Sequence, residues 1–346
     1  MKNGEPILPE WIEGRGPDAD VVISTRARLA RSLSAYPFPS RASVEDLAMV
    51  AREVRAASTG LTTRFPKLKA VSVDRLSAEE RNFLLDARVA SVEQVQAGEG
   101  RIIVLEPSAT LSIMVNEEDH LRLQAVLSGL APRDAWELVD WADDVLEKGL
   151  DYGYSPGYGY LTASVSNVGT GLRVSALMHL AGLALTRQLN AKLRAALDVG
   201  VSIRGVFGEG TVSVGDLFQV SNETTLGLSE SEIVDKVRAV AGYLLSEERA
   251  ARKELRGSEC NRLIERASRA LNVLQSAMSI RAEQAVALMS PVRLASAMEL
   301  TQECPLALLN ELMLGIRVGV PQEGATDIER AGAFRHRLAG ARISSC

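Results

Sequence analysis

The chain has 346 residues, long enough for one large domain or two ordinary ones with a substantial core. Its 39 basic residues are outnumbered by 44 acidic ones, and the net charge of −5 argues against a general nucleic-acid binder. Three separated cysteines and three scattered histidines argue against a disulfide framework and a cysteine-rich zinc site. We expect a cytoplasmic protein, because the sequence shows neither a signal-peptide pattern nor an apolar run long enough for a bilayer.

The first part of the chain predicts short strands mixed with amphipathic helices. Residues 1–20 are polar, contain Pro and Gly, and indicate an irregular N-terminal segment. Ser77 and Glu80 form a capping-box pattern at the start of one helix. Apolar spacing predicts a strand at 21–23, helices at 43–57, 77–85 and 132–150, and strands at 102–105 and 111–115.

The second part of the chain predicts more helix. Residues 151–161 are rich in Gly, Tyr and Pro and indicate a loop, and residues 172–198 have a helical pattern. Two strands at 199–207 and 211–220 form a predicted hairpin, and Ser229 caps a helix that runs toward Arg256. Beyond residue 250 only helical periodicity remains, at 258–288, 292–301 and 305–316, with a break at Pro291. We therefore expect an α+β domain over 21–250 and a helical domain over 251–346.

Several common catalytic motifs are missing from the sequence. It has no glycine–lysine P-loop pattern, no G-x-G-x-x-G and no HExxH. One GxSxG string occurs at 153–157, but Pro156 follows its serine and lacks the backbone N–H that an oxyanion hole requires. These features argue against a standard P-loop NTPase, a Rossmann dehydrogenase, a zincin and an α/β-hydrolase.

Four segments instead combine Arg, Glu and Gly in ways that a core does not require. They are 24–28 (STRAR), 116–122 (NEEDHLR), 159–173 (GYLTASVSNVGTGLR) and 204–210 (RGVFGEG). In an extended backbone Arg26 and Arg28 project from one face, where an anion would relieve their repulsion. Arg173 falls in the first turn of the predicted helix, whose N-terminus favours an anion. Taken singly, the four segments also fit plainer structures, namely solvated arginines, a charged loop, a capped helix and a hairpin turn.

Together, in this order and spacing, the four segments resemble the catalytic domain of guanidino (phosphagen) kinases over residues 20–250. The matching family patterns are S-[ST]-R-x-R, N-E-E-D-H-[LI]-R, G-[YF]-L-[TS]-x-C-P-[TS]-N-x-G-T-x-x-R and R-G-x-x-G-E. The resemblance implies an antiparallel β-sheet flanked by helices, of the glutamine-synthetase-like kind, followed here by a helical C-terminal domain. Only 23 residues precede Ser24, so we expect no counterpart of the helical front domain of creatine and arginine kinases. The GEG string and the C-terminal domain look like the bacterial protein-arginine kinases, which phosphorylate arginine side chains in proteins.

The resemblance assigns the phosphates of ATP to one group of residues. They are Ser24, Arg26, Arg28, Arg122, Arg173 and Arg204. Planar guanidinium groups can bind phosphates bidentately where a P-loop is missing. The family also implies Mg²⁺, which we expect to bridge phosphates and waters rather than to be held directly by protein side chains.

The resemblance makes Glu118 the catalytic carboxylate and Glu209 the second carboxylate that grips the acceptor guanidinium. Ser164 stands where the family has its reactive cysteine, so a negative group near the guanidinium is replaced by a neutral one. Activity is then either weakened or absent. Because all five arginines and both glutamates are present, we expect a working protein-arginine kinase. The alternatives are a pseudokinase that binds phosphoarginine or nucleotide, and a kinase for a small free guanidine.

The C-terminal segment has one further match. Residues 326–331 (TDIERA) resemble the R-D-x-x-R-A motif of an allosteric phosphoarginine pocket, with Asp327 and Arg330 retained and Thr326 replacing the first arginine. An ordinary helix start explains this string equally well. The implied partners are protein substrates, a zinc-finger activator protein, Clp-type protease machinery and a second copy in a homodimer, with neither nucleic acid nor a membrane.

Overall fold

The computed structural model describes residues 8–96, 98–197, 199–206, 213–314, 316 and 327–345. Its centre is an eight-stranded sheet in which every hydrogen-bonded neighbour is antiparallel. In spatial order the strands are β2 (Lys69–Ser72), β3 (Ile102–Leu105), β4 (Leu111–Val115), β5 (Leu121–Ser128), β1 (Val22–Arg31), β8 (Leu172–His179), β10 (Leu217–Asn222) and β9 (Val201–Gly205). Two-stranded pairs join β6 (Tyr154–Ser155) to β7 (Gly159–Tyr160) and β11 (Thr301–Gln302) to β12 (Arg342–Ile343).

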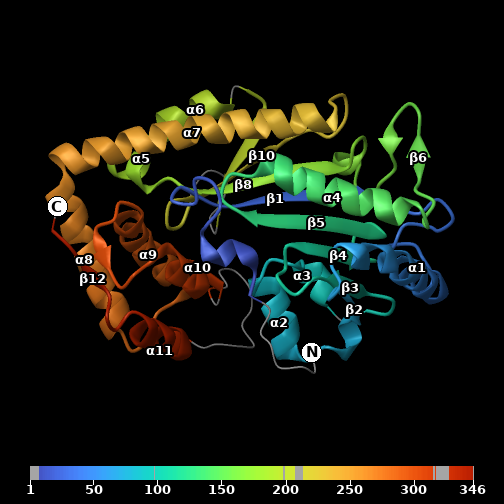
Figure 1. The fold of residues 1–346 in the computed structure, drawn as a ribbon, viewed down its shortest axis with the longest axis horizontal. Coiled ribbons are helices and arrows are strands. Elements are labelled where there is room, and N and C mark those ends of the chain that lie inside the picture. Colours follow the sequence, from blue (N-terminus) through green and yellow to red (C-terminus); the bar gives the residue numbers. More distant parts are fainter. Residues whose placement is uncertain are drawn as a thin grey trace.

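Helices surround this sheet and form one end of the molecule (Figure 1). Those before residue 250 are α1 (Val44–Ala57), α2 (Ala78–Asp86), α3 (Val92–Val95), α4 (Pro132–Glu147), α5 (Ala181–Leu185) and α6 (Leu189–Leu197). The long α7 (Glu230–Ser258) leads into α8 (Cys260–Ser276), α9 (Ala282–Ala297), α10 (Leu306–Leu314) and α11 (Asp327–Arg337). Short 3₁₀ turns lie at Glu10–Glu13, Ser58–Thr63, Val73–Arg75 and Val165–Asn167.

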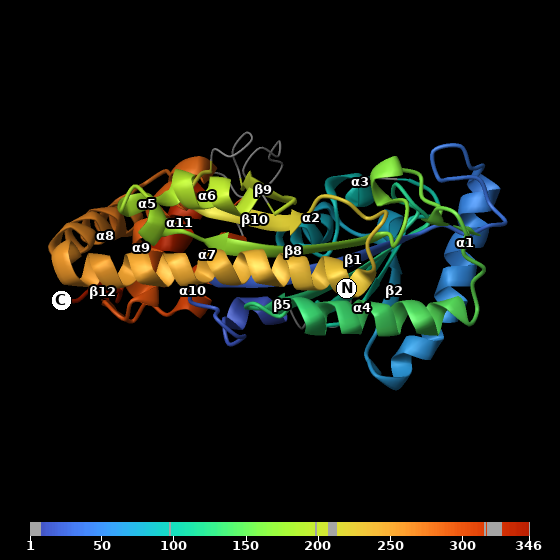
Figure 2. The ribbon, with the colours of Figure 1, turned by 90° about the horizontal axis from the view of Figure 1, so that it is seen from above.

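One face of the sheet is apolar and is covered by α4 and α7 (Figures 1 and 2). Leu29 of β1 and Leu123 of β5 lie directly opposite each other and are fully buried on this face. They belong to the same core as Val139 of α4 and Val234 of α7. Because side chains alternate along a strand, the other face of β1 presents Arg26 and Arg28.

The predicted helix at 172–198 is wrong for its first eight residues, which form the strand β8. This strand pairs with β1 on one side and β10 on the other, and most of its side chains are buried. A strand buried on both faces shows a continuous apolar run rather than alternation, which periodicity cannot distinguish from a buried helix. Arg173 therefore lies on a strand and not in the first turn of a helix, and the expected helix-terminus anion site is absent.

Most other predicted elements are confirmed by the structure. The strands β3 and β4 have the predicted bounds, and β9 pairs with β10 as a hairpin. The capping boxes at Ser77 and Ser229 are both formed. The expected break at Pro291 is wrong, because this proline lies inside α9, where its buried surroundings override its helix-breaking tendency. The strand β5 was not predicted, and neither were the short strands β11 and β12.

The C-terminal helices share a core with the sheet and with the N-terminal segment. Trp11 and Ile12, in the first 3₁₀ turn, are buried together with Leu217 of β10 and with residues of α8 to α11. The side-chain amide of Asn310 in α10 donates a hydrogen bond to the carbonyl of Ile12 (3.0 Å). Residues 8–20 are thus less irregular than their composition predicts, since they lie between the sheet and α10. The predicted domain boundary at residue 250 lies within the continuous helix α7 and stays a prediction.

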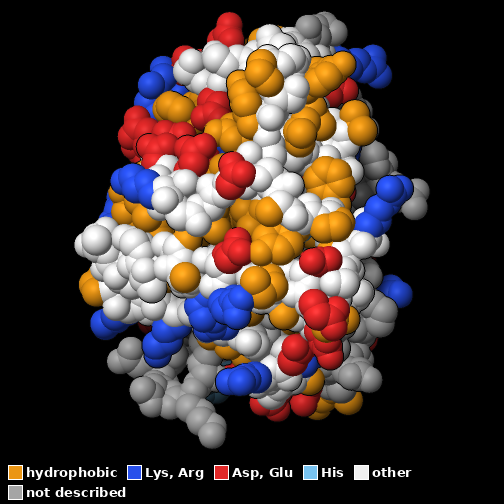
Figure 3. Space-filling view, turned by 90° about the vertical axis from the view of Figure 1, so that its right-hand side faces the viewer, with side chains coloured by type: hydrophobic (Ala, Val, Ile, Leu, Met, Phe, Trp, Pro, Cys, Tyr) orange, Lys and Arg blue, Asp and Glu red, His pale blue; other side chains and the backbone are white. Residues whose placement is uncertain are grey.

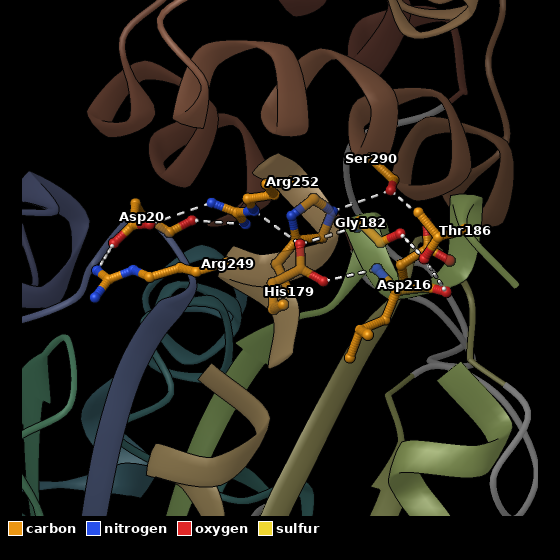
Figure 4. Close-up of polar contacts among 10 residues, drawn as sticks. Asp20, His179, Gly182, Thr186, Asp216, Arg249, Arg252 and Ser290 are labelled. Carbon is orange, nitrogen blue, oxygen red and sulfur yellow. Dashed lines mark hydrogen bonds and ion pairs between the residues drawn. The ribbon is translucent and has the colours of Figure 1, made fainter. Parts of the chain in front are cut away.

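A network of buried polar groups lies where α7, α9 and the sheet meet (Figure 4). Arg252 of α7 is bonded to Glu248 (2.8 Å) and to Asp20 (3.2 Å), while Glu248 accepts hydrogen bonds from the backbone N–H groups of Gly182 and Leu183. Beside it, Ser290 of α9 donates a hydrogen bond to the carboxylate of Asp216 (2.5 Å) and lies 3.0 Å from His179 Nε2. These contacts join the C-terminal helices to the sheet through paired charges.

Cysteines and membrane spans add two findings. Cys260 takes part in a disulfide, which the sequence did not predict, whereas Cys304 is free and buried. Across the described part of the chain, no helix combines the length and the apolar character that a membrane crossing requires.

Candidate active site

The five arginines of the sequence motifs share the sheet face that lies opposite α4 and α7. Arg28 lies directly across from Arg173, and Ala30, on the same face of β1, lies across from Arg122. Across the strands, Arg204 of β9 lies opposite Gln219 of β10, which lies opposite Leu177 of β8. Leu177 in turn lies opposite Ser24 of β1. Since directly opposed residues project from the same face, four strands place their guanidinium groups on one surface.

Part of this surface is hollowed into a cavity of about 270 Å³, which we call the charged cavity. It is lined by Arg28, Leu29, Ala30, Glu117, Glu118, Asp119, Arg122, Ser164, Ser166, Asn167, Gly171 and Arg173. The structure thus brings together three of the five predicted arginines, one of the two predicted glutamates and Ser164.

The turn between β4 and β5, residues 116–120, contributes to the lining of the charged cavity. Asn116 adopts a left-handed conformation (φ 59°) and its side-chain amide donates to the carbonyls of Leu47 and Gly100 (2.9 and 2.8 Å). Two other side chains of the turn are tied to backbone groups: Asp119 accepts from Ala163 N–H (2.6 Å), and His120 Nδ1 accepts from Leu33 N–H (3.0 Å).

The two glutamates of this turn differ in their surroundings. Glu117 is buried and forms an ion pair with Arg122 (2.6 Å) and a hydrogen bond with Ser91. Burial opposes its ionisation, but Arg122 and the hydrogen bonds outweigh burial and hold the pKa of Glu117 below its ordinary value. Glu118 is exposed and lines the cavity. Glu118 is therefore the carboxylate that an incoming cation meets.

Ser164 also lines the charged cavity and is half-buried. Its hydroxyl oxygen is 2.9 Å from that of Ser166, and its carbonyl accepts a hydrogen bond from Thr162 (2.8 Å). The bond from Ala163 N–H to Asp119 fixes this segment to the turn that carries Glu118. The position of Ser164 relative to Glu118 is therefore set by backbone contacts, not by a direct bond between the two side chains.

The arginines of the sheet lack matching negative charge. Among the described residues, no carboxylate forms an ion pair with Arg26, Arg28 or Arg173, and Arg173 Nε is buried without a partner. Burial and then the charges of neighbouring arginines lower the pKa of Arg26 to about 9. The same two causes lower the pKa values of Arg28 and Arg173. Such a cluster of desolvated cations is stabilised when an anion binds between them.

A second cavity of about 350 Å³, the mixed cavity, adjoins the first and shares Arg122 with it. Its polar lining includes Arg26, Arg88, Gln124 and Gln219, and its apolar lining includes Leu85, Val92, Met114, Val206, Met313, Leu314 and Ile316. Sequence analysis missed Arg88, because it lies outside every recognised motif, in the segment between α2 and α3.

The remaining predicted site residues lie elsewhere. Arg204 is exposed and lines neither cavity, although its charge helps lower the pKa of Arg173 after burial. Ser24 is buried on the arginine face and lines neither cavity. Glu209 and Thr326 lie outside the described residues.

The predicted allosteric residues lie in the C-terminal helices. Arg330 of α11 is buried and donates to Asp327 (2.6 Å) and to the carbonyl of Ile280 (2.8 Å). Two further guanidinium nitrogens, Nε and Nη2, are buried without a partner. Among the described residues, Asp327 and the carbonyl of Ile280 thus engage only Nη1 of this guanidinium.

Within the residues that the structure describes, no group of three or more His, Cys, Asp or Glu side chains is arranged to hold a metal ion. In the charged cavity Glu117 is engaged by Arg122 and Asp119 by backbone N–H, so the donor set fits a metal ion carried by a phosphate ligand.

Comparison with known families agrees with this geometry. A family model described as "ATP:guanido phosphotransferase, C-terminal catalytic domain" matches residues 49–251. The chain therefore belongs to the ATP:guanido phosphotransferase family, as its sequence motifs indicated. A second model, described as "Protein-arginine kinase McsB C-terminal domain", matches residues 260–344.

Relatives that match over almost their whole length indicate the subfamily. The chain is 41% identical to a protein-arginine kinase of Moorella thermoacetica, with 96% of this chain and 97% of the relative covered. It is 39% identical to a protein-arginine kinase of Pelotomaculum thermopropionicum, with 95% of each covered. The fold is similar to that of a lombricine kinase, with a TM-score of 0.60, 23% identity, and 72% and 73% of the two chains covered. The predicted antiparallel sheet flanked by helices is thus confirmed.

Proposed function

We propose that this chain is an ATP-dependent protein-arginine kinase, which transfers the γ-phosphoryl group of ATP in line to a guanidinium nitrogen of an arginine side chain. The observation that carries this proposal is the charged cavity itself, which Glu118 lines together with three arginines. Among the described residues, two of these arginines have no carboxylate partner, and Arg122 has one, Glu117. The arginines suit a polyphosphate, and the exposed glutamate suits a cationic acceptor.

In this proposal the arginine face aligns and neutralises the phosphates. Phosphoryl transfer requires little covalent work from the protein, so positioning and charge stabilisation supply most of the catalysis. Arg28, Arg122 and Arg173 line the cavity in which the γ-phosphoryl group would lie, and Arg26 lines the adjoining mixed cavity. Arg204, and Ser24 on the same face, are assigned to ATP by the family pattern. Mg²⁺ bound to the phosphates would supply further neutralisation of their charge.

Glu118 orients the acceptor and takes its proton. The guanidinium nitrogen attacks the γ-phosphorus, the bond to the bridging oxygen of ADP breaks, and one N–H proton passes to the carboxylate of Glu118. Glu209 would hold the other side of the guanidinium, by the family pattern. Ser164 accepts or donates a hydrogen bond at this site but stays neutral, so we expect it to weaken catalysis without abolishing it.

A polypeptide acceptor fits the surroundings of the charged cavity. The β6–β7 hairpin and the segment after it expose Tyr154, Tyr158, Leu161 and Val165, which is 87% exposed and directly follows Ser164. Figure 3 faces the end of the molecule where β6 lies and shows apolar side chains spread over it among scattered charges. Apolar surface beside a reactive cavity favours a protein chain over a small free guanidine.

The proposal also covers regulation, cellular location, partners and domain division. Asp327 and Arg330 would form a phosphoarginine pocket, supported by the two unpartnered nitrogens of Arg330. By the family resemblance we also propose a cytoplasmic location, a homodimer, a zinc-finger activator protein and delivery of products to Clp-type proteases. The division into a catalytic domain over 21–250 and a C-terminal domain over 251–346 belongs to the same proposal.

The decisive experiment is incubation of the full chain with ATP, Mg²⁺ and casein, followed by detection of acid-labile phosphate on arginine by mass spectrometry. We expect phosphoarginine with the wild type and none with Glu118→Gln. Tight nucleotide binding without any product would instead support a pseudokinase. Rapid turnover of free arginine or creatine, with casein unmodified, would support a kinase of small guanidines.

A further inference from the structure

One stretch of the lining of the charged cavity has little regular structure. It comprises residues 163–171, which we call the serine segment, and it includes a short 3₁₀ turn at Val165–Asn167. The serine segment contributes Ser164, Ser166, Asn167 and Gly171 to the lining. Because neither a long helix nor a strand ladder holds these residues, their positions depend on individual hydrogen bonds to neighbouring parts of the molecule.

Thr225, in the linker between β10 and α7, is bonded to the serine segment at several points. Its hydroxyl lies 3.0 Å from the carbonyl of Ser166 and 2.7 Å from that of Val168, so its proton is shared between the two residues that flank Asn167. Its own carbonyl accepts hydrogen bonds from the backbone N–H of Thr170 (3.0 Å) and from the hydroxyl of Thr170 (3.2 Å). One buried residue therefore holds the backbone on both sides of Asn167.

Two glycines allow the serine segment to pack this closely. Gly169 has a φ of 113°, and a Cβ atom there would lie 2.3 Å from the carbonyl oxygen of Thr225. Gly171 has a φ of 67°, and a Cβ atom there would lie 2.6 Å from the carbonyl oxygen of Ala30 on β1. The segment thus lies directly against Thr225 and against the central strand, with no room for side chains at these two positions.

The linker that carries Thr225 is itself anchored at both ends. Asn222, the last residue of β10, donates through its side-chain amide to the carbonyls of Thr224 and Leu172 (both 3.0 Å). At the other end of the linker, Ser229 caps the start of α7. Thr225 therefore has a fixed position relative to β8, the strand that begins at Leu172 and carries one arginine of the charged cavity.

The start of the serine segment is joined to the turn that carries Glu118. The backbone N–H of Ala163 donates to the carboxylate of Asp119 (2.6 Å), the residue directly after Glu118. Ser164 therefore lies between two anchors, Asp119 on one side and Thr225 on the other. The first anchor belongs to a motif that the sequence made visible, whereas Thr225 lies outside every recognised motif.

We propose that Thr225 is a positioning residue for the acceptor side of the reaction, whose hydroxyl keeps Ser164 and Asn167 where they meet the acceptor guanidinium beside Glu118. This inference rests on the proposed function, because it assumes that an arginine side chain enters the charged cavity. Thr225 is buried and lines neither cavity, so it acts through the serine segment and not on the substrate. The arginines of the charged cavity lie on β1, β5 and β8, so nucleotide affinity should not depend on Thr225.

The first test separates acceptor use from nucleotide binding in the full chain. Thr225→Val removes the hydroxyl and keeps the branched shape of the side chain. With ATP, Mg²⁺ and casein, we expect it to lower kcat/KM for casein about ten- to a hundredfold, because a small displacement of the lining misplaces the acceptor. The Kd for ATP, measured by isothermal titration calorimetry, should stay unchanged. Thr225→Ala should reproduce this split, and Thr225→Ser, which keeps the hydroxyl, should restore most of the activity.

A thiol at position 164 reports the position of the serine segment without any turnover. In Ser164→Cys we expect a lowered thiol pKa, since the thiol shares the cavity with three arginines. Adding Thr225→Val should return this pKa toward the ordinary value of about 8.5, because the segment is no longer held beside those charges. Adding Thr225→Ser should leave the pKa lowered. The pH dependence of alkylation measures all three values.

Matched controls come from two other threonines. Thr186, at the end of α5, also shares its hydroxyl between two carbonyls, those of Gly182 and Leu183 (2.9 and 3.4 Å), but it lines neither cavity. Thr186→Val should therefore lose the same kind of hydrogen bond and keep both kcat/KM and the thiol pKa. Thr224→Val, at an exposed position of the same linker, should also leave both unchanged.

Two outcomes would overturn the inference. One is an unchanged thiol pKa when Thr225→Val is added to Ser164→Cys. The other is an equal loss of kcat/KM in Thr225→Val and Thr186→Val, which would show a general effect of stability. A wild type that forms no phosphoarginine would overturn the proposed function instead. The thiol pKa would still show whether Thr225 positions the segment, so the two failures are distinguishable.

Discussion

Arg28 and Arg31 lie three residues apart on β1, yet they meet opposite surroundings because an odd spacing places them on opposite faces of the sheet. Arg31 is buried on the covered face, where Asp143 of α4 forms an ion pair with it (2.6 Å) and the ring of Tyr160 lies 3.5 Å from its guanidinium carbon. Arg28 lies on the open face, without an ion pair among the described residues. The charge of Arg31 is neutralised within the fold, whereas the charge of Arg28 has no counter-charge among the described residues.

The same contrast separates the arginine face from the junction in Figure 4. Arg252 is also buried, but Glu248 and Asp20 neutralise its charge. Burial and mutual repulsion instead lower the pKa of Arg26 to about 9. In a chain with 32 arginines and seven lysines, the lack of a counter-charge thus distinguishes Arg26 and Arg28 from the buried, paired Arg31 and Arg252.

The largest effect should come from removing a cation on the open face. We expect Arg28→Gln to lower the rate of phosphoarginine formation roughly a thousandfold, because a charge-stabilising donor aimed at the phosphates is lost. Thermal unfolding should show no loss of stability, since a repelling charge is also removed. Arg133→Gln, at an exposed ion pair, is the control. A clear destabilisation would contradict the claim that Arg28 has no structural role.

Removing the carboxylate partner of Arg31 should instead lower the stability of the fold. We expect Asp143→Asn to reduce the free energy of unfolding by about 3–5 kcal/mol, because a buried guanidinium loses its counter-charge. Urea denaturation measures this loss, and Asp235→Asn at the exposed pair with Arg133 should cost under about 1 kcal/mol. A similar small cost for both variants would show that the buried pair is not structural.

Adding an acid to the open face should report its positive potential. In Ser164→Cys the introduced thiol shares the cavity with three arginines, so its pKa should fall below the ordinary value of about 8.5. The pH dependence of alkylation measures this pKa. The phosphorylation rate should rise about ten- to a hundredfold. A thiol with an ordinary pKa, together with an unchanged phosphorylation rate, would show that the arginine charges do not affect position 164.

The smallest effect concerns the junction. Burial, followed by the charges of Arg293 and Arg252, holds the pKa of His179 well below its ordinary value. The unfolded chain binds a proton near pH 6.5 and the folded chain does not, so stability falls as pH drops below about 6.5, by at most about 1.4 kcal/mol per pH unit. His179→Gln should flatten this slope in urea denaturation, whereas the exposed His336→Gln should keep it. An unchanged slope in His179→Gln would contradict this assignment.

Sequence patterns predicted elements well where they depend on local signals. The capping boxes at Ser77 and Ser229 involve neighbouring residues only, and both form. The helix prediction for residues 172–179 was wrong, because β8 is buried between two strands and its apolar run reflects that tertiary position. Arg88 was missed for the same reason, since its link to the site depends on Gln124 and Trp11, which are distant in sequence.

The sequence by itself determined the family and the motif residues, with a serine at position 164, because these depend on residue identity and order. Only the tertiary structure decided which arginines lack partners and which segments form the walls of the two cavities. It separated Arg28 from Arg31 and placed the end of α10 beside Arg88. Charge pairing and cavity walls join residues that are far apart along the chain, and strand pairing and helix packing bring them together.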